Sequence, residues 1–113
     1  MRYVPKNCVG FEMTMELAEA LGVSEYWGDW ESDEHDPAVL ETIEEKFGVV
    51  PWAVAELREE RGGHRTGITG FESGTTYLLF EERDTRTPYW KKFSDLCDSA
   101  GSPETEGSWS QLM

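Results

Sequence analysis

Acidic residues are concentrated in one part of this 113-residue chain, and that concentration limits the surfaces it can present after folding. Residues 15–62 contain fourteen carboxylates against three basic residues, so this stretch carries −11 of the total net charge of −13. A surface that reads DNA needs Lys and Arg, because release of counterions from phosphate supplies most of its affinity. The charge of this stretch therefore favours a positively charged partner over nucleic acid.

The length and composition predict one folded domain with a single modest core. Hydrophobic residues make up 38% of the chain and aromatic residues 12%, which is typical of a globular protein. A pI near 4.4 argues against non-specific binding to nucleic acid or to anionic membranes. Two explanations of the acidity stay open, namely attraction of a basic partner and plain solubility in an acidic proteome.

The two cysteines, Cys8 and Cys97, have no short metal-binding spacing and are too few for a disulfide scaffold. The first residues lack the apolar core of a secretion signal, and no apolar run is long enough to span a bilayer. These features predict a cytoplasmic chain without metal or cofactor, in which Cys97 is a buried residue on a helix.

Capping residues and apolar periodicity predict four helices, each opened by a capping residue or a proline and closed by glycine. They span residues 15–21, 36–47, 51–61 and 87–100. On the last of them we expect one buried stripe, made of Tyr89, Phe93, Leu96, Cys97 and Ala100.

Alternating apolar residues over 9–13 predict an extended segment, and the β-rich stretches 66–71 and 75–82 predict a hairpin. In the second hairpin strand, apolar residues occupy both alternating sets, so both faces are expected to be partly covered. Residues 1–101 are expected to form the compact domain, and the polar residues 102–113 a flexible C-terminal tail.

The segment 40–61 resembles a helix-turn-helix unit. Ile43 and Phe47 lie on its first helix, Gly48 stands at the turn, and Val54 and Leu57 anchor its second helix. Followed by the hairpin, the segment resembles a winged-helix domain over residues 40–82. This resemblance implies a small single α+β domain of short helices plus a β-hairpin in winged-helix-like order, with helix 51–61 as the element that reads DNA.

The outward residues of that helix do not suit DNA. Glu56, Glu59 and Glu60 would repel phosphate, and Trp52 is the fourth residue of this face. A basic group follows at the end of the helix and gives the alternative DNA-binding set, Arg58, Arg61, His64 and Arg65. A winged helix-turn-helix regulator that binds DNA is therefore the alternative function.

An ordered array of carboxylates can instead occupy a cationic groove built for phosphates. In size, charge and aromatic content the chain is similar to small acidic phage proteins that block restriction or CRISPR nucleases. We therefore expect a non-enzymatic, DNA-mimic-like inhibitor of a nucleic-acid-handling protein, with aromatic anchors beside its carboxylates. The expected partner-binding residues are Trp27, Asp29, Trp30, Glu31, Asp33, Glu34, Trp52, Glu56, Glu59 and Glu60.

Catalytic signatures are weak. His35 lies in an acidic run that lacks the glycine and spacing of a calcium loop, and nothing local orients His64 toward either cysteine. The sequence has no phosphate-binding loop, no GxSxG and no HExxH. We therefore expect no catalytic residues and no metal site.

Overall fold

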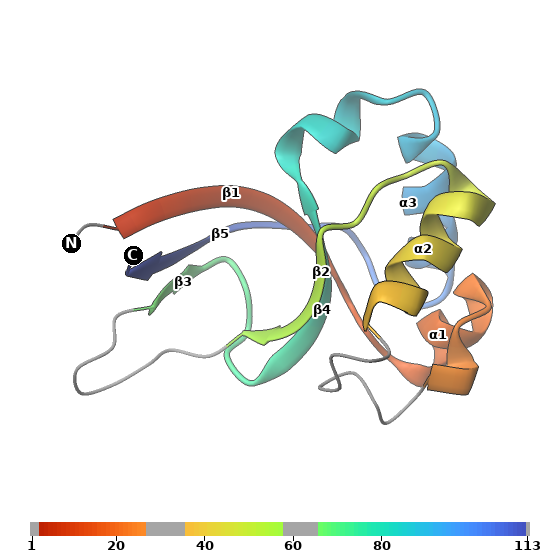
Figure 1. The fold of residues 1–113 in the computed structure, drawn as a ribbon, viewed down its shortest axis with the longest axis horizontal. Coiled ribbons are helices and arrows are strands. Elements are labelled where there is room, and N and C mark those ends of the chain that lie inside the picture. The colour runs from red at the N-terminus through yellow and green to blue at the C-terminus, as the bar shows by residue number, and fades with distance from the viewer. Residues whose placement is uncertain (1–2, 27–35, 58–65, 113) are drawn as a thin grey trace.

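The computed structural model describes residues 3–26, 36–57 and 66–112, and this part of the chain forms one antiparallel sheet with helices beside it (Figure 1). The sheet has five strands in the order β2-β4-β1-β5-β3. The strands are β1 (Tyr3–Glu12), β2 (Ala53–Leu57), β3 (Thr66–Thr69), β4 (Thr75–Glu81) and β5 (Thr105–Leu112). The helices are α1 (Met15–Leu21), α2 (Asp36–Phe47) and α3 (Trp90–Ser99), with short 3-10 turns η1 (Ser24–Tyr26) and η2 (Glu82–Arg86). The helices gather at one end of the sheet, and both chain termini lie at the other (Figure 1).

The predicted α+β class is confirmed, and so are the elements with clear capping signals. The Thr14 hydroxyl accepts a hydrogen bond from the Leu17 amide at 3.1 Å, which caps α1, and Gly22 closes that helix with φ +78°. Helix α2 has the predicted bounds, and Gly48 follows it with φ +71°. The extended segment predicted over 9–13 is confirmed for residues 9–12, which are part of β1.

The predicted helix 51–61 is wrong, because Ala53–Leu57 form β2, an edge strand. This strand pairs with β4 from Ala53↔Leu79 to Leu57↔Thr75. A short apolar run fits either a helix or a strand by periodicity, and pairing with an available neighbour decides the outcome. A strand therefore follows α2 where the helix-turn-helix resemblance requires a recognition helix, and the winged-helix order is not formed.

The predicted hairpin is also wrong, although both of its strands exist. Strand β3 pairs with β5, whereas β4 pairs with β1 and β2. Gly70, with φ +86°, turns the chain out of β3 and lies directly on β5, where an added Cβ would be 2.9 Å from the Cα of Gly107. This turn sends the chain across the sheet instead of back along β3.

The predicted flexible tail is wrong for residues 105–112, which form β5 between β1 and β3. Two side-chain hydrogen bonds fix the approach to this strand. The buried Ser102 hydroxyl donates to the carbonyl of Glu12 at 2.8 Å, and the Trp90 indole donates to Glu104 at 2.6 Å. Backbone pairing on both sides orders β5, which a polar sequence does not reveal.

Both faces of the sheet are covered, as the alternation in β4 predicts. Leu78 and Phe80 belong to the main core under the helices, and Phe11 lies in it with its ring centroid 5.5 Å from that of Phe93. A second, smaller cluster on Tyr77 and Leu79 covers the other face. Gly10 leaves room for that cluster, since an added Cβ would be 2.9 Å from Phe71.

Helix α3 starts later than predicted, at Trp90 instead of Thr87, because η2 occupies the chain up to Arg86 and Thr87 ends that turn. This later start changes which of the residues at the beginning of the helix is buried. Trp90 is buried, whereas Tyr89, expected on the buried stripe, is 58% exposed. Phe93 and Cys97 are buried as predicted.

Cys97 gives a prediction about pH. Burial raises the pKa of its thiol from 9.0 to about 12, so the folded chain holds this proton more tightly than the unfolded chain does. The resulting stability is complete below pH 9 and is lost as the pH rises towards 12. We expect the free energy of unfolding to fall by about 1 kcal/mol per pH unit in this window, relative to a Cys97→Ala variant. Urea denaturation of both proteins at about pH 8, 9.5 and 10.5 measures this difference. An equal dependence of the free energy of unfolding on pH in the two proteins would contradict the prediction.

Candidate functional site

Most residues of the predicted partner-binding set lie outside the described residues. These are Trp27, Asp29, Trp30, Glu31, Asp33, Glu34, Glu59 and Glu60. The alternative DNA-binding set, Arg58, Arg61, His64 and Arg65, also lies outside them. The structure therefore places two members of the predicted partner-binding set, Trp52 and Glu56.

Trp52 and Glu56 are both half-buried at the edge of the sheet. The Trp52 amide donates to the carbonyl of Leu79 at 2.9 Å, and its side chain packs against the smaller core cluster. Glu56 lies within β2, opposite Thr76 of β4. Trp52 thus has a structural role in covering the second face of the sheet.

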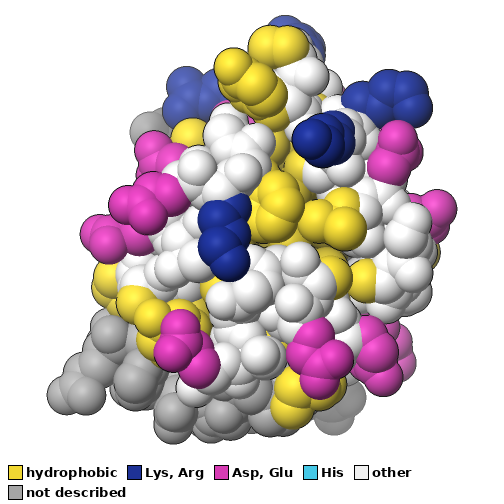
Figure 2. Space-filling view, turned by 90° about the vertical axis from the view of Figure 1, so that its right-hand side faces the viewer, with side chains coloured by type: hydrophobic (Ala, Val, Ile, Leu, Met, Phe, Trp, Pro, Cys, Tyr) yellow, Lys and Arg dark blue, Asp and Glu magenta, His cyan; other side chains and the backbone are white. Residues whose placement is uncertain are grey.

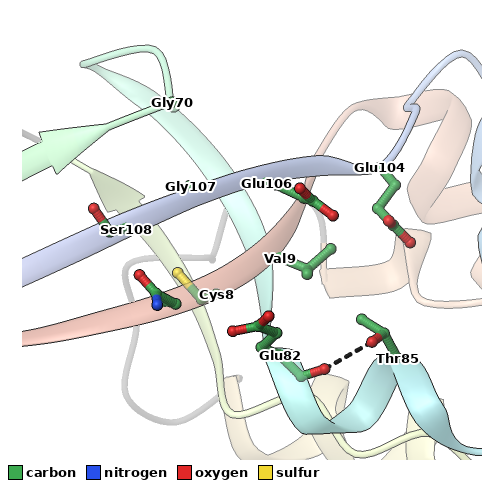
Figure 3. A pocket seen from close by; sticks show the side chains of 10 residues that line it. Cys8, Val9, Gly70, Glu82, Thr85, Glu104, Glu106, Gly107 and Ser108 are labelled. Atoms are coloured by element: carbon green, nitrogen blue, oxygen red, sulfur yellow. Dashed lines mark hydrogen bonds between the residues drawn. The ribbon is translucent and has the colours of Figure 1, made fainter.

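One cavity of the described structure has a volume of about 380 Å³ and three carboxylates in its lining (Figure 3). We call it the acidic cavity. It is lined by Asn7, Cys8, Val9, Gly70, Glu82, Thr85, Glu104, Glu106, Gly107 and Ser108, among which there is no Lys, Arg or His.

Two separate segments, 82–85 and 104–106, bring the three carboxylates together around Val9 of β1 (Figure 3). In the sheet Val9 pairs with Glu106, which sets the position of that residue beside β1. Glu82 begins η2, directly after β4, and the hydroxyl of Thr85 donates to its carbonyl at 2.8 Å. Glu104 lies just before β5 and is held by the Trp90 indole.

Two of the three carboxylates are available to a ligand. Glu82 and Glu106 are exposed, and neither forms an ion pair within the part of the chain that the structure describes. Glu104 uses Oε1 to accept from Trp90 and, at 3.4 Å, from the hydroxyl of Ser94, so it has a structural role as well.

The chemistry of the acidic cavity suits a cation. A protruding ammonium or guanidinium group would find carboxylates on two sides of the space and form charge-assisted hydrogen bonds with them. Cys8 is buried, with 2% of its surface exposed. The lining residues include no histidine that could act as a general base for its thiol. The described residues include no group of three side chains suited to a metal ion.

Sequence reasoning missed this cavity. Its residues come from 7–9, 70, 82–85 and 104–108, and the last of these segments lies in the predicted tail. The local signal for Glu82, an acidic cluster at the end of a strand, is typical of a solvated surface. Only the pairing of β5 with β1 brings Glu106 near Glu82.

Carboxylates are also exposed on the helical end of the molecule, at Glu16, Glu19, Glu41, Glu44 and Glu45. In the view onto that end, Asp and Glu side chains lie mostly around the periphery, with hydrophobic and basic side chains nearer the centre (Figure 2). The described acidic residues are therefore divided between the helices and the acidic cavity, and are not gathered on one face.

None of the described helices is long and apolar enough to cross a membrane. Comparison with protein-family models, with curated proteins and with solved structures finds no match.

Proposed function

We propose that this chain is a non-enzymatic, acidic protein-binding module of the cytoplasm. Its carboxylates occupy a basic surface on a nucleic-acid-handling protein and inhibit it by taking the place of phosphates, as a phage-type DNA mimic does. The contact is centred on the acidic cavity, which accepts a Lys or Arg side chain of the partner.

One observation carries this proposal: most exposed carboxylates of the described residues are not neutralised by ion pairs with other described residues. Within the described residues two ion pairs have a lysine or arginine partner, Arg83 with Glu81 and Lys91 with Asp95. Glu82 and Glu106 at the acidic cavity belong to neither. Their charge therefore remains available to steer and hold a cationic partner.

The alternative function, direct reading of DNA, is not favoured by any described feature. It required a recognition helix at 51–61, and residues 53–57 form a strand. The net charge of −13 opposes approach to a duplex as well.

The test is inhibition of DNA cleavage by a panel of restriction nucleases and RNA-guided nucleases. We expect stoichiometric inhibition of at least one of them by the wild-type chain. The double variant Glu82→Gln/Glu106→Gln should need at least tenfold more protein, because each lost charged contact costs on the order of 1 kcal/mol. Both residues are exposed, so the variant should fold normally.

A matched control removes the same charge elsewhere. Glu41 and Glu45 are exposed on α2, and a Glu41→Gln/Glu45→Gln variant has the same net charge as the cavity variant. We expect this control to inhibit within twofold of wild type. Inhibition of no nuclease would contradict the proposed function, and equal losses in both double variants would contradict the placement at the acidic cavity.

A further inference from the structure

A second pocket, opposite in charge to the acidic cavity, lies between the end of α2 and the start of α3. It has a volume of about 300 Å³ and is lined by Lys46, Phe47, Gly48, Tyr89, Lys92 and Phe93. We call it the lysine–aromatic pocket. On the helical end of the molecule, hydrophobic side chains and Lys or Arg side chains occur together near the centre of the view (Figure 2).

The aromatic part of the pocket is built rigidly. The rings of Phe47 and Phe93 meet edge to face with centroids 5.4 Å apart. Tyr89 lies against Gly48, where an added Cβ would be 3.1 Å from the ring. Glycine at this position, already required by φ +71°, therefore lets the tyrosine ring rest on the end of α2. Tyr89 is nevertheless 58% exposed, so one side of its ring is open to a partner.

Each helix contributes a lysine to the pocket, and neither lysine has an ion-pair partner among the described residues. The ammonium of Lys46 lies beside Gly22, at the C-terminal end of α1, where a cation is favoured. Lys92 differs from its neighbour Lys91, which pairs with Asp95 at 3.2 Å. Lys92 thus presents an uncompensated charge beside an apolar recess, in a chain with 23 acidic and 10 basic residues.

Electrostatics of the helix add to this positive charge. Tyr89 is the N-cap of α3 and makes no side-chain capping bond, and Lys92 and Phe93 lie in the first turn. The amide groups at the start of a helix carry partial positive charge, so they reinforce the effect of Lys92 on an anion.

We infer that the lysine–aromatic pocket binds an acidic peptide segment of a partner protein, with one leucine or aromatic side chain in the recess and carboxylates beside the lysines. This inference is independent of the proposed function, because it uses a different surface and the opposite charge. An apolar anchor flanked by acid matches both components of the pocket. A single strand of nucleic acid fits less well, because it requires a basic groove several nucleotides long. Glu44 and Glu45 are exposed on the same helix as Lys46.

The probe is an acetylated pentapeptide with a central leucine and two glutamates on each side, titrated into the ¹⁵N-labelled chain and followed by NMR. Salt at about 0.15 M shortens the reach of the repulsion between the peptide and the acidic chain to about 8 Å. We expect saturable shifts of the amides of Gly48, Tyr89 and Lys92. Replacing the central leucine by serine, or the four glutamates by glutamine, should weaken binding at least fivefold.

Neighbouring lysines give a matched pair of variants. Lys92→Gln should weaken binding of the peptide about five- to tenfold, whereas Lys91→Gln, with the same change of charge on the same helix, should leave it within twofold. Tyr89→Ala should weaken it at least fivefold, and the dispersion of the spectrum shows whether each variant is folded.

Three results with the peptide, the lysine variants or an oligonucleotide would overturn the inference. They are an absence of saturable shifts at 1 mM peptide, equal effects of the two lysine variants, and tighter binding of a five-nucleotide oligothymidylate than of the peptide. Octanoate tests whether an isolated hydrophobic anion suffices, and binding of octanoate as tight as that of the peptide would also overturn the assignment to a peptide.

Discussion

A chain cut after Glu104 is expected not to fold. The cut removes β5, which pairs with β1 over eight positions and with β3 over four. Without it, β1 becomes an edge with unpaired amide and carbonyl groups, and β3 loses the strand to which it pairs in the described structure. The lost pairing exceeds what a small domain, stable by about 5–15 kcal/mol, can tolerate. Circular dichroism and the NMR spectrum of the truncated chain give the answer, and a dispersed spectrum would contradict the expectation.

A single substitution tests the same strand without removing it from the chain. Ser108 pairs with Asn7 on one side and with Thr69 on the other, so a proline there has no edge on which to avoid the ladder. We expect Ser108→Pro to lower the free energy of unfolding by about 3 kcal/mol or more. Ser108→Ala, which keeps the backbone donor, should change it by less than about 1 kcal/mol. Equal stabilities of the two variants in urea would show that residue 108 lies outside the sheet.

Phe11→Ala is expected to cause the largest loss of stability among side-chain truncations. Phe11 is fully buried, and its ring lies 5.5 to 6.0 Å from those of Phe80, Trp90 and Phe93. These partners come from β4 and α3, so Phe11 joins the sheet to the helical layer. Removing a phenyl ring from such a core costs about 3–5 kcal/mol, through lost burial and the cavity left behind.

Urea denaturation measures this loss directly. The control is Val50→Ala at a residue that is 50% exposed, where a change within about 0.5 kcal/mol is expected. A loss below about 1 kcal/mol for Phe11→Ala would mean that the aromatic core is not packed as described.

Local signals made the first two helices predictable. Thr14 begins α1 with a capping hydrogen bond, and Gly22 ends it with a left-handed turn. Both signals depend on neighbouring residues alone. The alternation of Leu78, Leu79 and Phe80 correctly predicted a strand covered on both faces, because side chains alternate whatever the strand pairs with.

Non-local pairing accounts for the failures. Residues 53–57 fit a helix or a strand, and only the free edge of β4 makes them a strand. Residues 105–112 carry few apolar side chains, and their order comes from hydrogen bonding to β1, about a hundred residues earlier in the chain. The acidic cavity depends on that same pairing, since Glu106 reaches Val9 only through it. A resemblance based on apolar spacing around Gly48 could not anticipate either event.

The most direct test of the proposed function is the salt dependence of binding to the inhibited nuclease, measured by fluorescence anisotropy of the labelled chain. If carboxylates replace phosphates on a basic surface, the Kd should rise at least tenfold between about 50 and 300 mM NaCl. These salt concentrations are on the order of those that weaken protein–DNA contacts. A duplex that carries the nuclease's own target should displace the chain. A Kd that is unchanged by salt, together with a complex that excess duplex does not disturb, would contradict the account.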